Sequence, residues 1–378
     1  MKRILYVVNV DWFFVSHRLP LAIEAVKRGY EVFVITKNTG FKSEIEKTGA
    51  KFIHLEFDRS GKNPLQELTV IFKLYFIYRK LSPDLVHHVT LKPALYGTMA
   101  LKMLNSVKPE IVNAVTGLGY NFTDERKSGF QKVLLRLMQF AFKYSSTHFI
   151  FQNPDDLNFY IEQGLIKEGN SIIIKGSGVD TNTFQYSPPF KNSQLKVILN
   201  ARMLFDKGII EFCKAAHVLK SKWQHKAIFQ LVGDLDPQNL AGATKSDIEK
   251  FLIPGYIEWI GHRKDVAQVL KSADIVCLPS YREGLPKSLL EAMAIGRPIV
   301  TTDSPGCREC VEEGVNGFLV PVRDVELLSK RLNELLSSES LRLKMGERSR
   351  IKMEQAQMSL DKVIERTFKF YDKMLDGI

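Results

Sequence analysis

Two glutamates near an expected helix start are the residues whose type and spacing best suit chemistry in this sequence. Glu283 and Glu291 enclose the segment EGLPKSLLE, which follows the apolar run Ala273–Pro279. The run predicts a short buried strand, and Pro286 suits the first turn of a helix. Carboxylates accept hydrogen bonds from sugar and ribose hydroxyls, while free N–H groups at a helix start suit a phosphate, so a diphosphate with a sugar at each end would use all three. Two glutamates at this spacing also occur as solvated charges on a helix face.

A basic loop is the second candidate site. Arg202 and Lys207 lie in Asn200–Gly208, which follows an apolar segment that begins at Lys196. This pattern predicts a strand, a loop and a helix start. Two cations beside free helix N–H groups outline a diphosphate site, although a basic pair in a loop is also commonly solvated.

The segment Glu283–Glu309, which reads EGLPKSLLEAMAIGRPIVTTDSPGCRE, resembles the donor-site signature of family 4 glycosyltransferases. In that signature, as here, seven residues separate two glutamates. The resemblance implies that Glu283 contacts the transferred sugar and that Glu291 contacts the ribose of a nucleoside-diphosphate sugar. Gly284 and Leu285 would complete the donor-binding turn.

The same resemblance assigns roles to other loops of the second half. The family has Arg and Lys in the loop that matches Arg202 and Lys207, where they hold the donor diphosphate. They would also stabilise the charge that develops on the departing diphosphate, and one such contact is worth about 3 kcal/mol at a transition state. Gly261 and Arg263 lie in a segment that resembles the family's nucleotide-side loop, where they would read the base.

Asp234 and Asp236 form an Asp-x-Asp pattern, which binds a metal diphosphate in a different glycosyltransferase fold. Here the pattern follows an expected Rossmann strand, so we expect a turn role, with no metal site and no cofactor.

The first half resembles the acceptor side of the family. Asp84–Lys92 contains the family's Asp-x-x-His pattern, which His87 matches, but Val89 stands where many members have a second histidine. Ser16–Pro20 lies where many members have a glycine pair, which this chain lacks, and Thr116–Tyr120 is a glycine loop after an expected strand. Histidines at strand ends are also often core residues, and lone glycine loops are often plain turns. The acceptor-side candidates are His17, Arg18, His87, His88, Lys92, Gly117 and Gly119.

Strand and helix patterns alternate through both halves, which predicts an α/β fold with parallel sheets. We expect two Rossmann-like domains facing across a cleft (GT-B type), with the active site between them. The expected domains are an acceptor-binding domain at 1–181, a nucleotide-sugar-binding domain at 182–355, and a C-terminal helix at 356–378 that packs back on the first domain.

The charge of the chain is uneven. Residues 1–150 carry 22 Lys and Arg against 12 Asp and Glu, a net +10, whereas residues 151–378 carry 31 against 30, a net +1. This asymmetry indicates an anionic partner for the first half. The apolar and basic stretches Leu68–Leu81 and Arg126–Lys143 could supply a helix that lies on an anionic membrane, although helices packed in a Rossmann core give the same pattern.

The remaining composition bounds the compartment. Four cysteines imply no disulfide framework, and Cys307-x-x-Cys310 has neither a second pair nor a nearby histidine for zinc. No apolar stretch is long enough to span a membrane, and the apolar N-terminus is interrupted by Asn9 and Asp11, so it predicts a strand rather than a signal peptide. We expect a cytoplasmic protein, peripheral on the inner face of the membrane.

The expected function is a retaining, metal-independent hexosyltransferase. It would move a hexosyl or N-acetylhexosaminyl group from a nucleoside-diphosphate sugar, UDP-linked, to a lipid-linked saccharide of surface polysaccharides such as capsule, O-antigen or lipopolysaccharide. One alternative is a nucleoside-diphosphate-sugar epimerase on the same fold. The other is a basic nucleic-acid-binding module, which has no recognised signature here; we expect no nucleic-acid partner.

Overall fold

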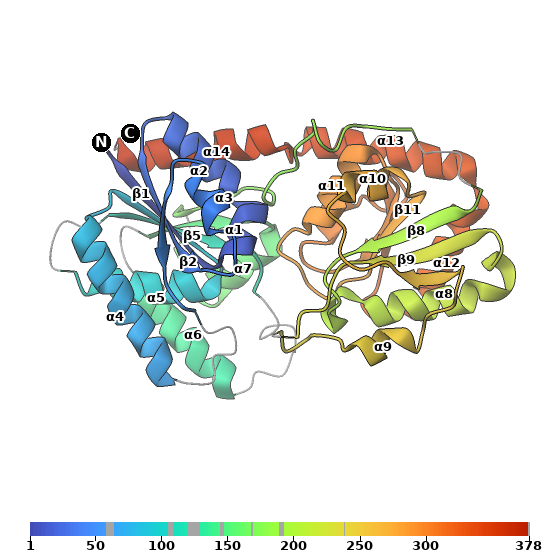
Figure 1. Ribbon diagram of the computed structural model, residues 1–378, viewed down its shortest axis with the longest axis horizontal. Coiled ribbons are helices and arrows are strands. Elements are labelled where there is room, and N and C mark those ends of the chain that lie inside the picture. The colour runs from blue at the N-terminus through green and yellow to red at the C-terminus, as the bar shows by residue number, and fades with distance from the viewer. Residues whose placement is uncertain are drawn as a thin grey trace. The chain divides into compact units, whose positions relative to one another are not determined.

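Two α/β units make up the chain in its computed structural model (Figure 1). The first unit comprises Met1–Ser177 and Lys362–Ile378, and the second comprises Gly178–Asp361. The structure describes residues 1–57, 64–104, 109–118, 129–143, 147–167, 169–188, 193–237 and 239–376. The predicted class of two parallel α/β domains is confirmed.

The first unit is built on a seven-stranded sheet whose order is β3-β2-β1-β4-β5-β6-β7. All of its strand pairs are parallel. The strands are β1 (Arg3–Val10), β2 (Glu31–Lys37), β3 (Lys51–His54), β4 (Leu85–Val89), β5 (Glu110–Val115), β6 (Thr147–Phe151) and β7 (Ser171–Ile173). The order reverses between β1 and β4, and such a switch point is where open α/β sheets bind ligands, beyond the carboxyl ends of the strands.

Helices cover both faces of this sheet, as the near-continuous apolar strands require. They are α1 (Asp11–His17), α2 (Leu19–Lys27), α3 (Lys42–Glu46), α4 (Pro64–Leu81), α5 (Leu91–Lys102), α6 (Gly129–Phe142), α7 (Pro154–Glu162) and α14 (Leu360–Leu375). Tyr6 and Leu21 share one core cluster with Phe368 and Tyr371, so α14 packs back on the first unit as predicted. Leu74 and Tyr78 of α4 pack with Leu101 of α5 in a second cluster, which includes residues of the sheet's other face.

The second unit has a six-stranded parallel sheet in the order β10-β9-β8-β11-β12-β13. Its strands are β8 (Leu195–Asn200), β9 (Ala227–Val232), β10 (Ile257–Trp259), β11 (Ile275–Leu278), β12 (Ile299–Thr302) and β13 (Gly317–Val320). Its α-helices are α8 (Ile209–Trp223), α9 (Lys245–Glu249), α10 (Val266–Lys271), α11 (Lys287–Ile295), α12 (Val325–Ser337) and α13 (Glu339–Gln355). Here the order reverses between β8 and β11, the strands that precede the two predicted donor loops.

The two places where the chain passes between the units lie next to each other. Val179 forms a parallel bridge with Ser359, and the Val179 carbonyl accepts from the Leu360 amide at 2.9 Å. A Cβ added at Gly178, whose φ is +77°, would lie 2.6 Å from the Leu360 Cα, so only glycine permits this close approach.

A fully buried arginine fixes the position of α11. The Arg297 guanidinium donates to the carbonyls of Leu270 and Lys271 at 3.2 and 2.7 Å, and to that of Ser187 at 2.7 Å. It also donates to two carbonyls at the end of α11, those of Ile295 and Gly296 at 3.4 and 3.2 Å. Burial lowers the pKa of this arginine to about 10, but the carbonyl shell satisfies its donors.

The four cysteines are free thiols and are all buried. Among the described residues, every helix is too short or too polar to cross a bilayer.

Candidate functional site

The basic loop of the second unit lies against the end of the neighbouring strand. It leaves β8 at Asn200 and reaches α8 through Gly208, which has a φ of +72°. A Cβ at Gly208 would lie 2.1 Å from the Pro279 carbonyl oxygen, just past the end of β11. Since no side chain fits there, the backbones of the two loops pack directly against each other.

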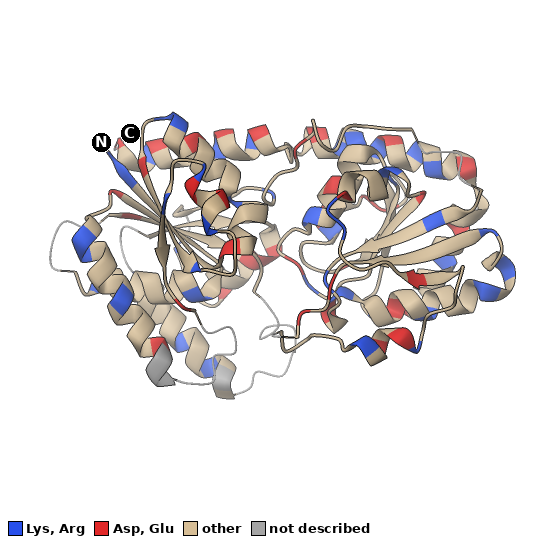
Figure 2. Ribbon diagram, in the orientation of Figure 1, with Lys and Arg blue, Asp and Glu red and all other residues tan. Residues whose placement is uncertain are grey.

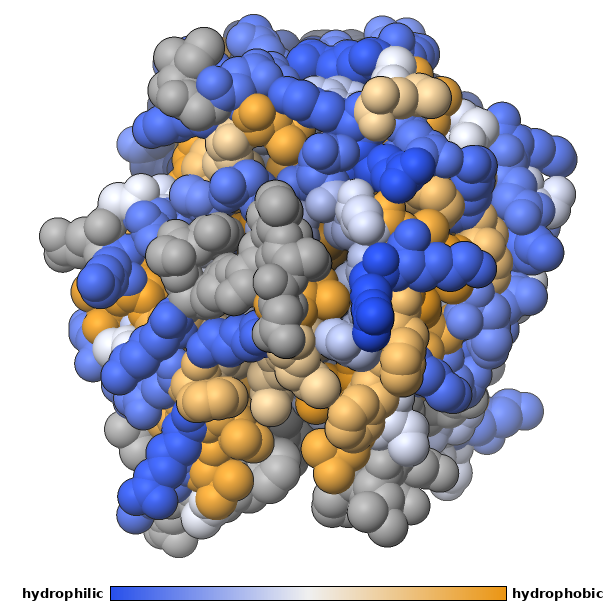
Figure 3. Space-filling model, turned by 90° about the vertical axis from the view of Figure 1, so that its left-hand side faces the viewer, coloured by the Kyte–Doolittle hydropathy of each residue, from blue (hydrophilic) through white to orange (hydrophobic). Residues whose placement is uncertain are grey.

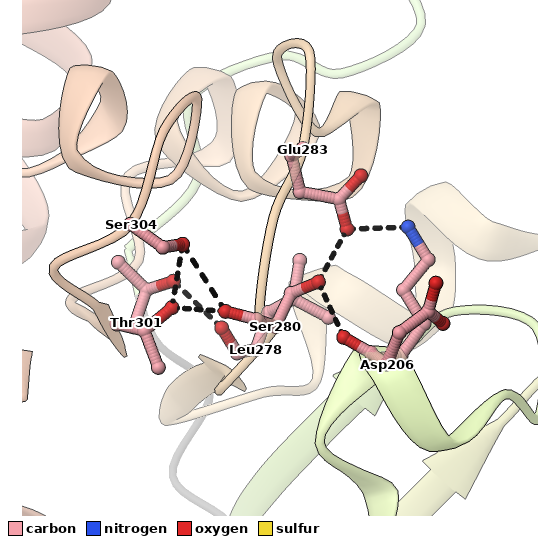
Figure 4. Close-up of polar contacts among 8 residues, drawn as sticks. Asp206, Leu278, Ser280, Glu283, Thr301 and Ser304 are labelled. Atoms are coloured by element: carbon pink, nitrogen blue, oxygen red, sulfur yellow. Dashed lines mark hydrogen bonds and ion pairs between the residues drawn. The ribbon is translucent and has the colours of Figure 1, made fainter. Parts of the chain in front are cut away.

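This packing brings two predicted catalytic residues into contact. The Lys207 Nζ forms an ion pair with the Glu283 Oε1, and the two side chains are only 17% and 12% exposed. The Ser280 hydroxyl lies 2.7 Å from the same Oε1 and 2.9 Å from the Asp206 carbonyl oxygen (Figure 4). A hydroxyl has one hydrogen to donate, so Ser280 shares it between the two loops.

The Glu283 turn is clamped on its other side by the loop that follows β12. The Glu283 amide donates to the Pro305 carbonyl at 3.0 Å. A Cβ at Gly306 would lie 2.5 Å from the carbonyl oxygens of Glu283 and Gly284. The Ser280 carbonyl accepts from the hydroxyls of Thr302 and Ser304, the latter at 3.2 Å, as Figure 4 shows for Ser304. The carboxylate is therefore presented by a turn that is held from two sides.

The start of α11 follows directly. Pro286 is its N-cap residue and makes no side-chain cap hydrogen bond. Leu285 is buried in the core, so its backbone rather than its side chain can meet a ligand. Glu291 is 7% exposed, and Lys287 approaches its Oε1 at 3.8 Å. Burial raises the pKa of Glu291 to about 7, and Lys287 opposes that rise.

The Asp-x-Asp pattern is engaged by protein partners. The Arg202 guanidinium forms an ion pair with Asp236, and the Asp234 carboxylate accepts from the His262 amide at 3.2 Å. No group of three or more potential metal ligands occurs among the described residues. Both aspartates thus act as anchors of strand-end loops in this structure.

The expected base-reading loop is joined to the basic loop through the backbone. The Gly261 carbonyl accepts from the Gly233 amide at 2.8 Å, and a Cβ at Gly233 would lie 2.0 Å from the Ala201 carbonyl oxygen. Arg263 forms a two-bond pair with Asp265, at 2.8 Å for each bond, and is about half exposed. The predicted donor residues therefore lie in the loops at the carboxyl ends of β8, β10 and β11 and on α11.

In the first unit, His88 is a core residue, and its acceptor-side prediction is corrected. Its Nδ1 lies 2.8 Å from the Asn113 Oδ1, and its Nε2 lies 3.0 Å from the Tyr78 hydroxyl. Burial lowers the pKa of His88 to about 4. A Cβ at Gly97 would lie 2.0 Å from its Nε2, so the ring fills a space that only a glycine leaves open.

The other acceptor-side candidates have different environments. His87 is 1% exposed and its Nδ1 contacts the Tyr371 hydroxyl of α14, while Arg18 is 4% exposed. His17 is partly exposed and stacks on the Phe13 ring with centroids 4.2 Å apart. Lys92 pairs with the Glu67 carboxylate at 2.7 Å. Gly117 has a φ of +114°, and Gly119 lies outside the described residues.

Comparison with known proteins identifies the family of the chain. The family "Glycosyl transferases group 1" matches residues 180–352, and "Glycosyl transferase 4-like" matches residues 3–153. An N,N'-diacetylbacillosaminyl-diphospho-undecaprenol alpha-1,3-N-acetylgalactosaminyltransferase of Campylobacter jejuni is 31% identical over 381 residues, with 96% of each chain covered. This chain is a family 4 glycosyltransferase.

Other relatives agree with that assignment. A UDP-Gal:alpha-D-GlcNAc-diphosphoundecaprenol alpha-1,3-galactosyltransferase of Escherichia coli is 23% identical, covering 83% of this chain and 81% of its own. Among solved structures, sucrose-phosphate synthase of Thermosynechococcus elongatus superposes with a TM-score of 0.81 and Anabaena HepE in complex with UDP with 0.77. Both are 18% identical, and each comparison covers at least 99% of both chains. They establish the GT-B fold of this glycosyltransferase.

Sequence reasoning missed the residues that position the glycosyltransferase's predicted site. Ser280 directly follows Pro279, which comes just after the end of β11. This position next to a strand end was the feature of the sequence that could have identified Ser280. Asp206 supplies a carbonyl that the Tyr281 amide binds at 2.8 Å, and burial raises the pKa of its own side chain. In the first unit, Asp11 anchors the loop that follows β2, since its carboxylate accepts from the amides of Thr39 and Phe41 at 2.7 and 3.0 Å.

The raised pKa of Glu291 predicts a pH-dependent stability. Its carboxyl binds a proton more tightly in the folded state, with a pKa of about 7, than in the unfolded state, where the ordinary value is 4.5. The free energy of unfolding should therefore fall as pH rises from 4.5 to about 7 and then level off, by about 3 kcal/mol. Urea unfolding of the wild type and of Glu291→Gln across this range measures the difference. A difference that is flat with pH would contradict the burial of an ionisable Glu291.

Proposed function

We propose that this glycosyltransferase moves a hexosyl or N-acetylhexosaminyl group from a UDP-linked sugar to a lipid-linked saccharide, with retention of anomeric configuration and without a metal. The observation that carries the proposal is the Lys207–Glu283 pair, which lies at the carboxyl ends of β8 and β11 near the start of α11. The names of the Campylobacter and Escherichia relatives support an acceptor on a diphospho-undecaprenol carrier.

The proposed roles follow from charge and position. Arg202 and Lys207 hold the donor diphosphate together with the first amides of α11. Glu283 accepts from hydroxyls of the transferred sugar, and Glu291 accepts from those of the ribose. Gly261 and Arg263 lie on the base side.

The proposed reaction needs no protein nucleophile. A hydroxyl oxygen of the acceptor bonds to the anomeric carbon of the donor, while the bond from that carbon to the diphosphate oxygen breaks. The departing diphosphate takes the proton of the attacking hydroxyl. The contribution of the enzyme is positioning and stabilisation of the negative charge that gathers on the leaving diphosphate.

Donor binding must exchange ion-pair partners. Lys207 is paired with Glu283 in the structure, so a donor diphosphate has to draw its ammonium group away from that carboxylate. Glu283 keeps the Ser280 hydroxyl and the clamped turn when this happens. It therefore stays in place, and its freed oxygen can accept from the sugar. The pair opposes binding of a bare nucleoside diphosphate, which offers Glu283 no hydroxyl in return.

A surface of the first unit supports membrane association of the enzyme. On α4, Leu68, Phe72 and Phe76 are 50%, 51% and 61% exposed at a spacing of four residues. On α6, Val133, Leu137 and Phe140 are 55%, 42% and 63% exposed. Lys73, Arg79 and Lys80 on α4, and Lys132, Arg136 and Lys143 at α6, are exposed as well. Figure 2 shows Lys and Arg positions in blue along both helices. Figure 3, which looks onto the side that carries α4, shows hydrophobic patches among hydrophilic ones.

We define these six apolar residues as the apolar stripes and propose that they rest on an anionic membrane on its cytoplasmic side. Soluble surfaces rarely expose so many large apolar side chains together. Each basic residue near an anionic surface contributes about 1 kcal/mol, and burial of a large apolar side chain contributes about 1.5–3 kcal/mol. A few of each suffice for reversible association.

The function is tested by supplying a panel of UDP-sugars, with and without a membrane extract that contains lipid-linked saccharides. We expect UDP release only when one particular UDP-sugar and the extract are both present. NMR of the product should show that the transferred sugar keeps the anomeric configuration that it has in the donor. Activity in EDTA should equal activity with Mg²⁺, since Arg202, Lys207 and α11 supply the positive charge. Conversion of the donor without any acceptor would indicate the epimerase instead, and loss of activity in EDTA that Mg²⁺ or Mn²⁺ restores would contradict the metal-free reaction.

The partner exchange predicts an unusual variant. Glu283→Gln should lower transfer strongly, because the sugar loses its carboxylate, yet it should bind UDP more tightly because Lys207 is released. A partly buried ion pair of about 1 kcal/mol corresponds to about a fivefold lower Kd. Calorimetry with UDP measures it.

The control is a double-mutant cycle. In a Lys207→Met background the same Glu283→Gln change should leave the UDP affinity unaltered, because no pair remains to be broken. Weaker UDP binding by Glu283→Gln in the native background would show that the two residues do not exchange partners.

Membrane association predicts that the enzyme sediments with vesicles rich in anionic lipid at low salt and is largely released at high salt. Lys132→Glu with Arg136→Glu should weaken sedimentation, and Phe76→Ser with Phe140→Ser should weaken it even at low salt. UDP binding should be unchanged in all of them.

Two control pairs lie on exposed positions of the second unit. Lys344→Glu with Arg348→Glu repeats the charge change at the same helical spacing on α13, and Val218→Ser with Leu343→Ser repeats the loss of exposed apolar groups. Equal effects of test and control pairs would mean that the binding surface is not the one on α4 and α6.

A further inference from the structure

Arg18 is a buried cation that has no counter-charge among the described residues. Its residue is 4% exposed, and it forms no ion pair with any carboxylate in the part of the chain that the structure describes. One terminal nitrogen donates to the His17 carbonyl at 3.3 Å, and its buried Nε has no hydrogen-bond partner there. Burial lowers the pKa of Arg18 to about 10, which still leaves it charged at neutral pH. An unpaired buried charge of this kind costs several kcal/mol, so its retention calls for a reason.

The contrast with Arg297 argues against a structural role for Arg18. Arg297 is also buried, but five carbonyl oxygens surround its guanidinium. Arg18 has one long contact to the carbonyl of the preceding residue. A guanidinium with most of its donors unused is suited to bind something that the chain itself does not supply.

His87 provides a second unused polar atom close to this charge. The ring is 1% exposed, and its Nε2 is buried without a partner, while its Nδ1 contacts the Tyr371 hydroxyl. Burial lowers the pKa of His87 well below its ordinary value, and the nearby Arg18 charge lowers it further, so the ring is neutral. When the Tyr371 hydroxyl donates to Nδ1, the ring proton lies on Nε2, where it can donate to an anion.

Both residues lie beside β1 and β4, the two strands between which the order of the first sheet reverses. His87 is the middle residue of β4, and Arg18 joins α1 to α2, the two helices that follow β1. Thr90, directly after β4, has a φ of +74°, which is a strained value for a β-branched residue, and its buried hydroxyl oxygen has no partner. A strained strand end and unsatisfied polar atoms thus occur together along the two strands at which the sheet order reverses.

We infer that Arg18 and His87 form an oxyanion subsite of the first unit, which takes the diphosphate group that links the acceptor saccharide to its lipid. The inference rests on the proposed function for the choice of acceptor, but the subsite chemistry stands on the residues. A guanidinium is a planar multi-donor group suited to phosphate oxygens, and the anion would neutralise the buried charge. The donor diphosphate has its own cations in the second unit, so the two anions need different sites.

Pyrophosphate binding to UDP-saturated protein tests the subsite without knowledge of the acceptor. With UDP filling the donor site, calorimetry should show inorganic pyrophosphate binding to the wild type. Arg18→Met should weaken that binding about tenfold or more, whereas Arg28→Met, which removes an exposed arginine from the same region, should not. Pyrophosphate that only displaces UDP, or that binds both variants like the wild type, would overturn the subsite.

Stability and kinetics separate a ligand-binding arginine from a structural one. Arg18→Met should unfold at the same temperature as the wild type or higher, because it removes an unpaired buried charge. In the transfer assay it should raise the acceptor KM about tenfold or more with the donor KM unchanged, and Arg18→Lys should restore part of the loss.

A lower unfolding temperature with unchanged pyrophosphate affinity would identify Arg18 as a structural residue. If the wild type transfers no sugar to any lipid-linked acceptor yet binds pyrophosphate through Arg18, the proposed function fails while the subsite stands.

Discussion

The direct backbone contact between the loop after β8 and the end of β11 is the constraint on which the predicted donor site depends. Gly208 leaves no room for a side chain next to the Pro279 carbonyl, so the two loops form one surface. Lys207 and Glu283, which are 76 residues apart in the chain, meet on that surface. Ser280 then ties Glu283 to the Asp206 carbonyl. The geometry of the site thus follows from strand order and backbone packing, with the side chains adjusting only the last contact.

The grouping of the predicted donor residues could be anticipated from the sequence better than that of the acceptor-side candidates, for a physical reason. The donor residues follow strand ends within short segments, so their types and spacing are visible locally. The contact between His87 and Tyr371 joins residues 284 apart, and the carbonyl shell of Arg297 draws on three separate segments, so neither leaves a local pattern. The error at His88 was avoidable: neighbouring residues of a strand point to opposite faces, so His87 and His88 could not both line one site.

The two units share one architecture but differ in whether carboxylates of the chain neutralise their cations. Each is built on an open parallel sheet whose strand order reverses once. In the second unit both predicted diphosphate cations have carboxylate partners within the chain, Asp236 for Arg202 and Glu283 for Lys207. In the first unit Arg18 has none among the described residues. The fold therefore carries little electrostatic cost at the proposed donor site and a larger one at the proposed acceptor subsite.

This difference bears on how each unit would discriminate between anions. A diphosphate that binds Lys207 has to replace Glu283 as its partner, so the net gain in binding free energy is only the difference between the two interactions. An anion alone therefore binds weakly there. A sugar whose hydroxyls bind Glu283 adds the remaining binding free energy. Such a site rewards the complete nucleotide sugar over its product, which favours turnover. Arg18 has no carboxylate partner to give up when an anion arrives, so an anion there gains the full interaction and relieves the cost of the buried charge. An acceptor whose saccharide varies but whose diphosphate does not is the kind of ligand that such an anchor would suit.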